Sequence, residues 1–202
     1  MSFPNHAYDT IIFDIGDVLC TKSLESSHLS QQTLKRVLSS TLWANQEKGI
    51  LDQQSCYAEI SRSFQLDPEH LRLAIQDVRQ SITFIPEMVS LLQELKARNH
   101  HIRLYAASNI TRFDFEYTSG IFDYSVFDGL YPSHVVGERK PALDFYRRVL
   151  EELGGDPARM IFIDDKEENV MAAASFGIHG IVFKDAQEVK MEISKLLIPE
   201  ME

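Results

Sequence analysis

Short apolar segments alternate along this chain with longer stretches that have a helical spacing of apolar residues. Four of the segments cover residues 10–14, 102–107, 160–164 and 180–183, and a weaker one lies near 125–130. Segments of this length that are rich in Ile, Val and Phe are typical of strands buried on both faces of a sheet. Such strands, separated by helices, predict an α/β protein with a parallel sheet.

Four helical patterns separate or follow these predicted strands. Pro86 begins the first and Pro141 the second, which ends at Gly154; the third covers 167–176 and the fourth follows Asp185. Proline in the first turn and glycine past the end are the usual boundaries of helices. We therefore expect a Rossmann-like parallel sheet with helices on both faces.

Residues 22–85 interrupt the alternation because they contain no convincing strand. Three amphipathic helices are predicted there, and the last begins at Asp67 and Pro68. We expect a small helical insertion placed after the first strand. The residues that define the faces of the first two helices are Leu34, Val37, Leu38, Thr41 and Leu42, and then Tyr57, Ile60 and Phe64.

The charge of the 202-residue chain limits its partners. The formal net charge of −10 argues against binding to nucleic acid or an anionic membrane, because phosphate-rich partners require clustered Lys and Arg. A small phosphorylated metabolite needs only a few local positive charges and remains compatible. Cys20 and Cys56 offer neither a disulfide framework nor metal-ligand spacing. The N-terminal residues contain no apolar stretch of signal-peptide length, and no segment approaches the roughly 20 apolar residues of a membrane span. We therefore expect a cytoplasmic protein.

Polar residues gather where three of the predicted strands end, and a fourth cluster lies just before a predicted helix. In a parallel sheet, ligands bind outside the carboxyl ends of the strands, so these residues are candidates for a site. Taken singly, the clusters at strand ends are typical of turns or helix caps, and Lys140 before a proline is typical of solvated surface. Their occurrence in this order on one predicted scaffold indicates a common function. The clusters are Asp14 with Asp17, Ser108 with Asn109, Arg139 with Lys140, and Asp164 with Asp165.

These clusters resemble the four motifs of the haloacid dehalogenase-like hydrolases, and the resemblance covers nearly the whole chain. The motifs read FDIGDVL, ASNI, GERKP and FIDDKEEN. The insertion resembles the helical cap of the branch that contains the epoxide hydrolase N-terminal phosphatases and small sugar-phosphate phosphatases. The segment WANQEKG, which contains Trp43, Glu47 and Gly49, is similar to the cap signature of that branch.

The resemblance implies a magnesium-dependent phosphatase that hydrolyses a small-molecule phosphate ester. Its catalytic core would comprise residues 1–21 and 86–202, and its helical cap residues 22–85. Asp14 would attack phosphorus and form an aspartyl-phosphate, which water then hydrolyses.

The same resemblance assigns roles to the other residues of the clusters. Mg²⁺ would be bound by the carboxylates of Asp14 and Asp165 and by the backbone carbonyl of Gly16. The groups expected to bind or neutralise the phosphoryl oxygens are the Ser108 hydroxyl, the Asn109 backbone and Lys140. The residues expected to orient Lys140 and metal-bound water are Asp164 and Asn169.

The first motif departs at Gly16 from the pattern of most phosphatases in this family. Those enzymes carry a second aspartate there, which protonates the leaving group. Glycine cannot act as a general acid, although its carbonyl can still bind a metal. Asp17, one residue later, is a candidate for the missing acid and equally a candidate turn residue that faces solvent.

Three other functions are open alternatives. A 2-haloacid dehalogenase would use Asp14 against carbon without a metal, but Asp164 and Asp165 would crowd negative charge around an anionic substrate. A phosphatase of terpenyl or prenyl phosphates would act in terpenoid biosynthesis by the same chemistry. A non-catalytic phosphate-binding protein would keep the metal site and lack turnover. Lys22 and Trp43 are candidates for the entrance of the site, although a tryptophan in a cap is more often part of the core.

Overall fold

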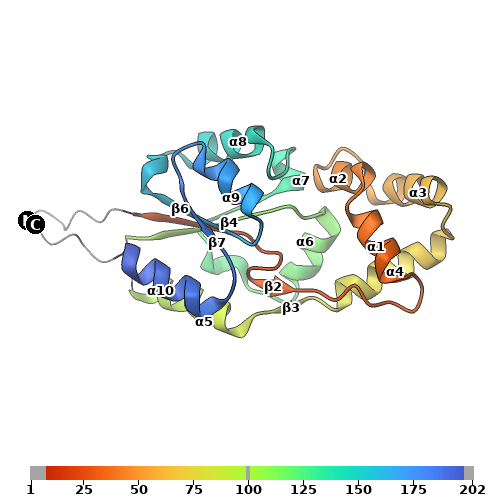
Figure 1. The fold of residues 1–202 in the computed structure, drawn as a ribbon, viewed down its shortest axis with the longest axis horizontal. Coiled ribbons are helices and arrows are strands. Elements are labelled where there is room, and N and C mark those ends of the chain that lie inside the picture. Colours follow the sequence, from red (N-terminus) through yellow and green to blue (C-terminus); the bar gives the residue numbers. More distant parts are fainter. Residues whose placement is uncertain (1–7, 99–100, 198–202) are drawn as a thin grey trace, which may run out of the picture.

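The computed structural model describes residues 8–98 and 101–197, and a five-stranded parallel sheet forms its centre (Figure 1). The strands are β1 (Thr10–Phe13), β4 (Arg103–Ser108), β5 (Gly129–Pro132), β6 (Met160–Asp164) and β7 (His179–Val182). Their order is β5-β4-β1-β6-β7, so β1 is central and its Ile12 lies opposite Tyr105 of β4 and Phe162 of β6. The predicted α/β fold with a parallel sheet is confirmed.

Helices cover both faces of this sheet, as predicted. They are α5 (Pro86–Arg98) and α10 (Ala186–Leu196) on one face, and α8 (Leu143–Leu153) and α9 (Glu167–Ala174) on the other (Figure 1). Side chains of β1 enter both resulting apolar cores: Ile11 packs with α5 and α10, and Ile12 with α8 and α9. Successive side chains of a strand point to opposite faces, which is why a strand covered on both faces is apolar throughout.

Some boundaries differ from those predicted. The weak strand candidate begins only at Gly129, because the Asp123 side chain caps a short 3-10 turn at Tyr124–Val126. The helix expected from Pro141 begins at Leu143. The helices that the sequence pattern did not predict are α6 (Arg112–Ser119) and α7 (Ser133–Val136).

A helical insert, residues 22–82, lies between two short antiparallel strands, β2 (Cys20–Thr21) and β3 (Thr83–Phe84). Its helices are α1 (Gln31–Leu38), α2 (Thr41–Glu47), α3 (Gln53–Phe64) and α4 (Pro68–Gln80). The prediction that residues 22–85 contain no strand is therefore wrong at β3. Each of these strands has only two residues, which is too short for a periodic pattern to identify.

The prediction that residues Leu34 to Leu42 lie on one face of a single helix is also wrong, because these residues are divided between α1 and α2. Ser39 ends α1, and the Ser40 side chain caps α2 by accepting a hydrogen bond from the Trp43 N–H at 3.2 Å. Hydroxyl side chains bond to nearby backbone groups and so interrupt a helix that apolar spacing alone would continue.

The helical insert has an apolar core of its own and stands at the carboxyl end of the sheet (Figure 1). Leu34, Ile60 and Leu71, from three different helices, are fully buried in that core. The insert thus faces the edge of the sheet where the strand-end clusters lie. In the described parts of the chain, no helix is both long enough and apolar enough to cross a membrane.

Candidate active site

Asp14 follows the central strand at its carboxyl end and is 7% exposed. Its backbone N–H donates a hydrogen bond of 2.8 Å to the carbonyl of Ile163 on β6. Its Oδ1 accepts a hydrogen bond of 2.7 Å from the Ile15 N–H and lies 2.9 Å from Nζ of Lys140. Burial raises the pKa of the Asp14 carboxyl, although Lys140 opposes that shift. The carboxylate is thus held in one orientation beside a cation.

Lys140 is enclosed by protein and only 1% exposed. Its Nζ donates hydrogen bonds to Asp164 Oδ2 at 2.6 Å and to the carbonyl of Ala107 at 2.8 Å, in addition to its contact with Asp14. Burial opposes the charge of the lysine, but Asp14 and Asp164 together raise the pKa of its ammonium group. The arrangement keeps a positive charge fixed between two carboxylates.

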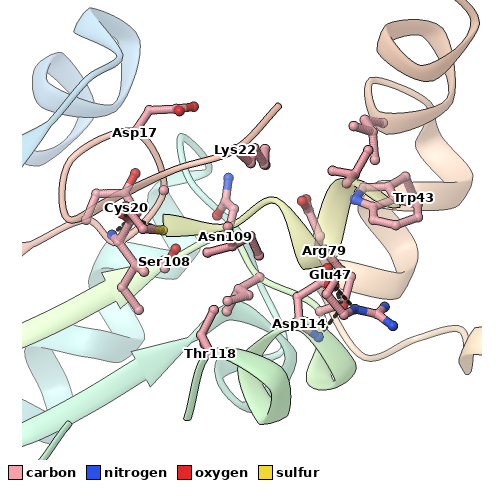
Figure 2. Close-up of a pocket in the computed structure, with 18 of the residues that line it drawn as sticks. Asp17, Cys20, Lys22, Trp43, Glu47, Arg79, Ser108, Asn109, Asp114 and Thr118 are labelled. Carbon is pink, nitrogen blue, oxygen red and sulfur yellow. Dashed lines mark hydrogen bonds and ion pairs between the residues drawn. The ribbon is translucent and has the colours of Figure 1, made fainter. Parts of the chain in front are cut away.

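Ser108 ends β4, and Asn109 begins the loop that follows. The Asn109 side chain makes two hydrogen bonds to the backbone of Lys140. Nδ2 donates to the Lys140 carbonyl and Oδ1 accepts from the Lys140 N–H, both at 2.8 Å. Ser108 and Asn109 line one side of the pocket (Figure 2). The sequence motif predicted a phosphate contact for the Asn109 backbone; the structure adds that the Asn109 side chain positions the lysine loop.

Asp164 has both carboxylate oxygens engaged by its neighbours. Oδ2 accepts from Lys140, and Oδ1 accepts from the Lys166 N–H at 2.9 Å and from Asn169 Nδ2 at 2.8 Å. Asp164 is fully buried and Asn169 is 2% exposed. These contacts suit Asp164 to orienting the groups around it.

Asp14, Asp164 and Asp165 form an acidic cluster whose nearest oxygens all lie within 4.8 Å of one another. Burial, followed by the charges of Asp14 and Asp164, raises the pKa of Asp165 to about 6. Among the described residues, the buried Oδ1 of Asn169 has no hydrogen-bond partner. A crowded set of carboxylates with an unpartnered oxygen acceptor beside it fits a hard divalent cation such as Mg²⁺.

Gly16 and Asp17 form the turn after Asp14. Asp17 has a left-handed φ of +59°, and its N–H donates to the Cys20 carbonyl at 2.7 Å. Its exposed carboxylate lies at the pocket margin, apart from Ser108 in Figure 2. Gly16 has no neighbouring atom within 4 Å of the place where a Cβ would stand. Position 16 can therefore hold a side chain, and both predicted roles of Asp17 stay predictions.

A pocket of about 480 Å³ lies between the carboxyl end of the sheet and the helical insert (Figure 2). Lys22 and Trp43 both line it. Trp43 is 5% exposed and also packs in the core of the insert, so it both lines the pocket and belongs to that core. The other apolar residues that line the pocket include Leu24, Leu38, Ile75, Val78, Ile82 and Ile110.

Two ion pairs join the helical insert to the sheet at this pocket. Arg79 of α4 contacts Asp114 of α6 at 2.7 Å, and Glu47 of α2 contacts Arg139 at 2.9 Å. Arg79 and Asp114 carry no local sequence signal, because their pairing depends on two segments that meet only in the folded chain. From the sequence, Glu47 is identified only as a member of the WANQEKG segment, and no partner is predicted for it.

Comparison with known proteins places this geometry in a family. The model of the haloacid dehalogenase-like hydrolases matches residues 8–177. The sesquiterpene phosphatase astK of Aspergillus oryzae is 30% identical over 192 residues, which are 94% of this chain and 97% of that protein. The drimenol cyclase drtB of Aspergillus calidoustus is 31% identical over 92% of this chain, but the chain spans only 36% of that longer protein.

Solved structures share the fold. A HAD family enzyme from Bacteroides thetaiotaomicron, in complex with magnesium and inorganic phosphate, has a TM-score of 0.69 and 21% identity over 88% of this chain and 94% of that chain. A HAD-like family hydrolase from Porphyromonas gingivalis has a TM-score of 0.73 and 23% identity, covering 95% and 98% of the two chains. These identities are evidence for the fold alone. The family match along residues 8–177 and the 30% identity to astK lead to one assignment: the chain belongs to the haloacid dehalogenase-like hydrolases.

Proposed function

We propose that this hydrolase is a magnesium-dependent phosphatase that cleaves small-molecule phosphate esters through an aspartyl-phosphate. The observation that carries the proposal is the buried Nζ of Lys140, which lies 2.6 Å from Asp164 and 2.9 Å from Asp14, a residue that lines the pocket. A fixed cation beside a carboxylate nucleophile lowers the cost of bringing a phosphate dianion to it.

Asp14 is the nucleophile in this proposal. Within the described residues, the contacts of its carboxylate engage Oδ1, which leaves Oδ2 to attack phosphorus. The new bond joins Oδ2 to phosphorus while the ester P–O bond breaks, and the leaving alkoxide takes a proton. Water then attacks the phosphorus of the aspartyl-phosphate, which releases inorganic phosphate and restores the carboxylate.

The remaining residues bind, orient or neutralise. The Ser108 hydroxyl and the Asn109 N–H donate to phosphoryl oxygens, while Asp164 and Asn169 keep Lys140 and bound water in place. Mg²⁺, held by Asp14, Asp165 and the Gly16 carbonyl, supplies the positive charge that offsets the carboxylates and the phosphoryl oxygens. Residues 1–21 and 86–202 are the catalytic core in this proposal, and residues 22–85 are the cap over it.

Hydrolysis of p-nitrophenyl phosphate by the purified protein tests the proposal. We expect turnover that requires added MgCl₂ and stops with EDTA. Turnover of 2-chloropropionate without metal would instead support the dehalogenase alternative. Binding of inorganic phosphate without any turnover would support the non-catalytic alternative.

A terpenyl phosphate is a second, narrower candidate for the substrate. A relative that matches almost end to end is a sesquiterpene phosphatase, and the insert side of the pocket offers apolar surface at Leu38, Ile75 and Val78. Apolar walls favour a hydrocarbon leaving group over a sugar, whose hydroxyls would lose hydrogen bonds to water there. Comparing kcat/KM for farnesyl phosphate and glucose 6-phosphate tests this candidate: a preference for the sugar phosphate would exclude it.

A further inference from the structure

Glu47, the last residue of α2, joins the helical insert to two separate loops of the candidate phosphate site. Its carboxylate Oε2 lies 2.9 Å from Nε of Arg139, the residue before Lys140. Its backbone carbonyl accepts a hydrogen bond of 2.6 Å from the Ser133 hydroxyl. The side chain of Glu47 is only 12% exposed and Ser133 is fully buried, whereas Arg139 is 34% exposed.

Ser133 carries the second contact to the loop of Asn109. The serine is fully buried, and its Oγ also accepts a hydrogen bond of 3.0 Å from the N–H of Ile110. Ile110 directly follows Asn109, just as Lys140 directly follows Arg139. Glu47 therefore contacts the residue before Lys140 directly and the residue after Asn109 through Ser133. Asn109 and Lys140 already join the two loops by their paired hydrogen bonds.

The backbone just after Glu47 approaches the core closely. A Cβ at Gly49 would stand 2.7 Å from the carbonyl oxygen of His134, and Gly49 has a φ of +71°. Both facts require glycine there, since any side chain would push α2 away from α7. The WANQEKG segment thus acquires a structural explanation: Trp43 lines the pocket, Glu47 makes the contacts, and Gly49 permits them.

We infer that Glu47 is a positioning residue that couples docking of the helical insert to the placement of Asn109 and Lys140. The inference rests on the proposed phosphatase function for its kinetic consequence, and on geometry alone for the coupling. Neither of the other insert–core ion pairs recorded among the described residues reaches both loops. Asp114, the partner of Arg79, accepts a hydrogen bond from Thr111 in the Asn109 loop, and Lys48 pairs with Glu138 beside Arg139. When the insert covers the pocket, the contacts of Glu47 hold both loops in the arrangement that suits the phosphoryl group.

Kinetics of Glu47→Gln and Arg139→Gln provide the first test. Each variant should lower kcat for p-nitrophenyl phosphate by about tenfold, because small displacements of reacting groups are costly, while KM changes less. The double variant should be no slower than the worse single one, since both substitutions remove one interaction. Lys48→Gln is the matched control, because Lys48 directly follows Glu47 and its pair with Glu138 is longer, at 3.8 Å instead of 2.9 Å.

Amide hydrogen exchange provides a second readout that does not depend on turnover. The N–H groups of Ile110 and Lys140 are hydrogen-bonded to Ser133 Oγ and Asn109 Oδ1. Glu47→Gln removes the ion pair with Arg139 but keeps the backbone carbonyl that Ser133 contacts, so it should raise exchange about tenfold at Lys140, with the exchange of β1 and β6 unchanged. Gly49→Val should displace α2 and raise exchange at both N–H groups.

The outcomes separate the coupling from the proposed function. Unchanged exchange at Lys140 in Glu47→Gln, or at both positions in Gly49→Val, would overturn the coupling, as would equal effects of Lys48→Gln. A higher KM with an unchanged kcat would make Glu47 a substrate contact and also overturn it. If exchange is faster in Glu47→Gln but the wild-type protein hydrolyses no phosphate ester, the coupling stands and the phosphatase proposal is refuted.

Discussion

Asp14 lines the pocket and pairs with the buried Lys140, and it offers the most direct test of the proposed chemistry. Asp14→Asn keeps the shape of the side chain but removes the nucleophilic oxygen, so phosphatase turnover should fall by roughly 10³-fold or more. Lys140 retains its hydrogen bond to Asp164, and the fold should therefore persist. Steady-state kinetics and circular dichroism check both statements. Retention of more than a few per cent of turnover would refute a covalent role for Asp14.

Gly16 stands where most phosphatases that the first motif resembles carry a second aspartate, and leaving-group dependence tests its effect. General acid catalysis contributes on the order of 10² to 10⁴ in rate, and basic alkoxides need it most. The wild type should therefore favour aryl over simple alkyl phosphates. Gly16→Asp has room for its side chain and should improve alkyl phosphates more than p-nitrophenyl phosphate. An unchanged ratio of kcat/KM for the two classes would contradict the protonation argument.

Asp17→Asn is the companion variant, because Asp17 is the candidate substitute acid. Its carboxylate is exposed and its backbone is left-handed, a conformation that asparagine tolerates well. If Asp17 protonates the leaving group, the substitution damages alkyl substrates selectively. If Asp17 only shapes the turn, the two substrate classes change alike.

At the scale of elements, the packing of α9 on β7 depends on a glycine. A Cβ at Gly180 would lie 2.3 Å from Cγ1 of Val170, so Gly180→Ala should destabilise the fold by about 1–3 kcal/mol. Val170→Ala removes the obstructing methyl groups and should restore much of that loss in the double variant. Urea unfolding measures all three variants. Additive losses in the double variant would show that the clash is not the cause.

The acidic cluster of Asp14, Asp164 and Asp165 affects the stability of the whole molecule, because it gathers negative charge in a chain whose net charge is −10. Mg²⁺ should raise the midpoint of thermal unfolding of the wild type, because a ligand that binds only the folded state stabilises it. Asp165→Ala should abolish this shift and raise the Mg²⁺ concentration for half-maximal activity at least about tenfold. Glu167→Gln, an exposed change two residues away, is the control. Equal shifts in Asp165→Ala and the wild type would argue against Asp165 as a ligand.

Selection of the substrate also involves the whole molecule, because the pocket exists only between the helical insert and the sheet. Leu38 lines the pocket and is half-buried, so Leu38→Gln should lower kcat/KM for farnesyl phosphate more than for p-nitrophenyl phosphate. Leu29→Gln is matched in chemistry and also contacts the core of the insert, but Leu29 is not among the residues that line the pocket. Equal effects of the two substitutions on the ratio would exclude recognition by this wall.

The sheet, most of its helices and the three clusters at strand ends are predictable from the amino-acid sequence. Period and composition are local properties, and a parallel sheet necessarily brings the carboxyl ends of its strands to one edge. For that reason Asp14, Ser108 and Asp164, which are far apart in the chain, are expected at one place, whereas Lys140 is expected there only from the family resemblance.

How the helical insert meets the sheet depends on tertiary contacts. The break at Ser39 and Ser40, the ion pair of Arg79 and the contacts of Glu47 depend on backbone hydrogen bonds and on segments that meet after folding. Neither periodicity nor motif spacing contains such information, because a long-range contact leaves no trace in the local order of residues. The candidate site residues are therefore predictable along the chain, whereas the shape of the pocket and the contacts between its loops require the packed molecule.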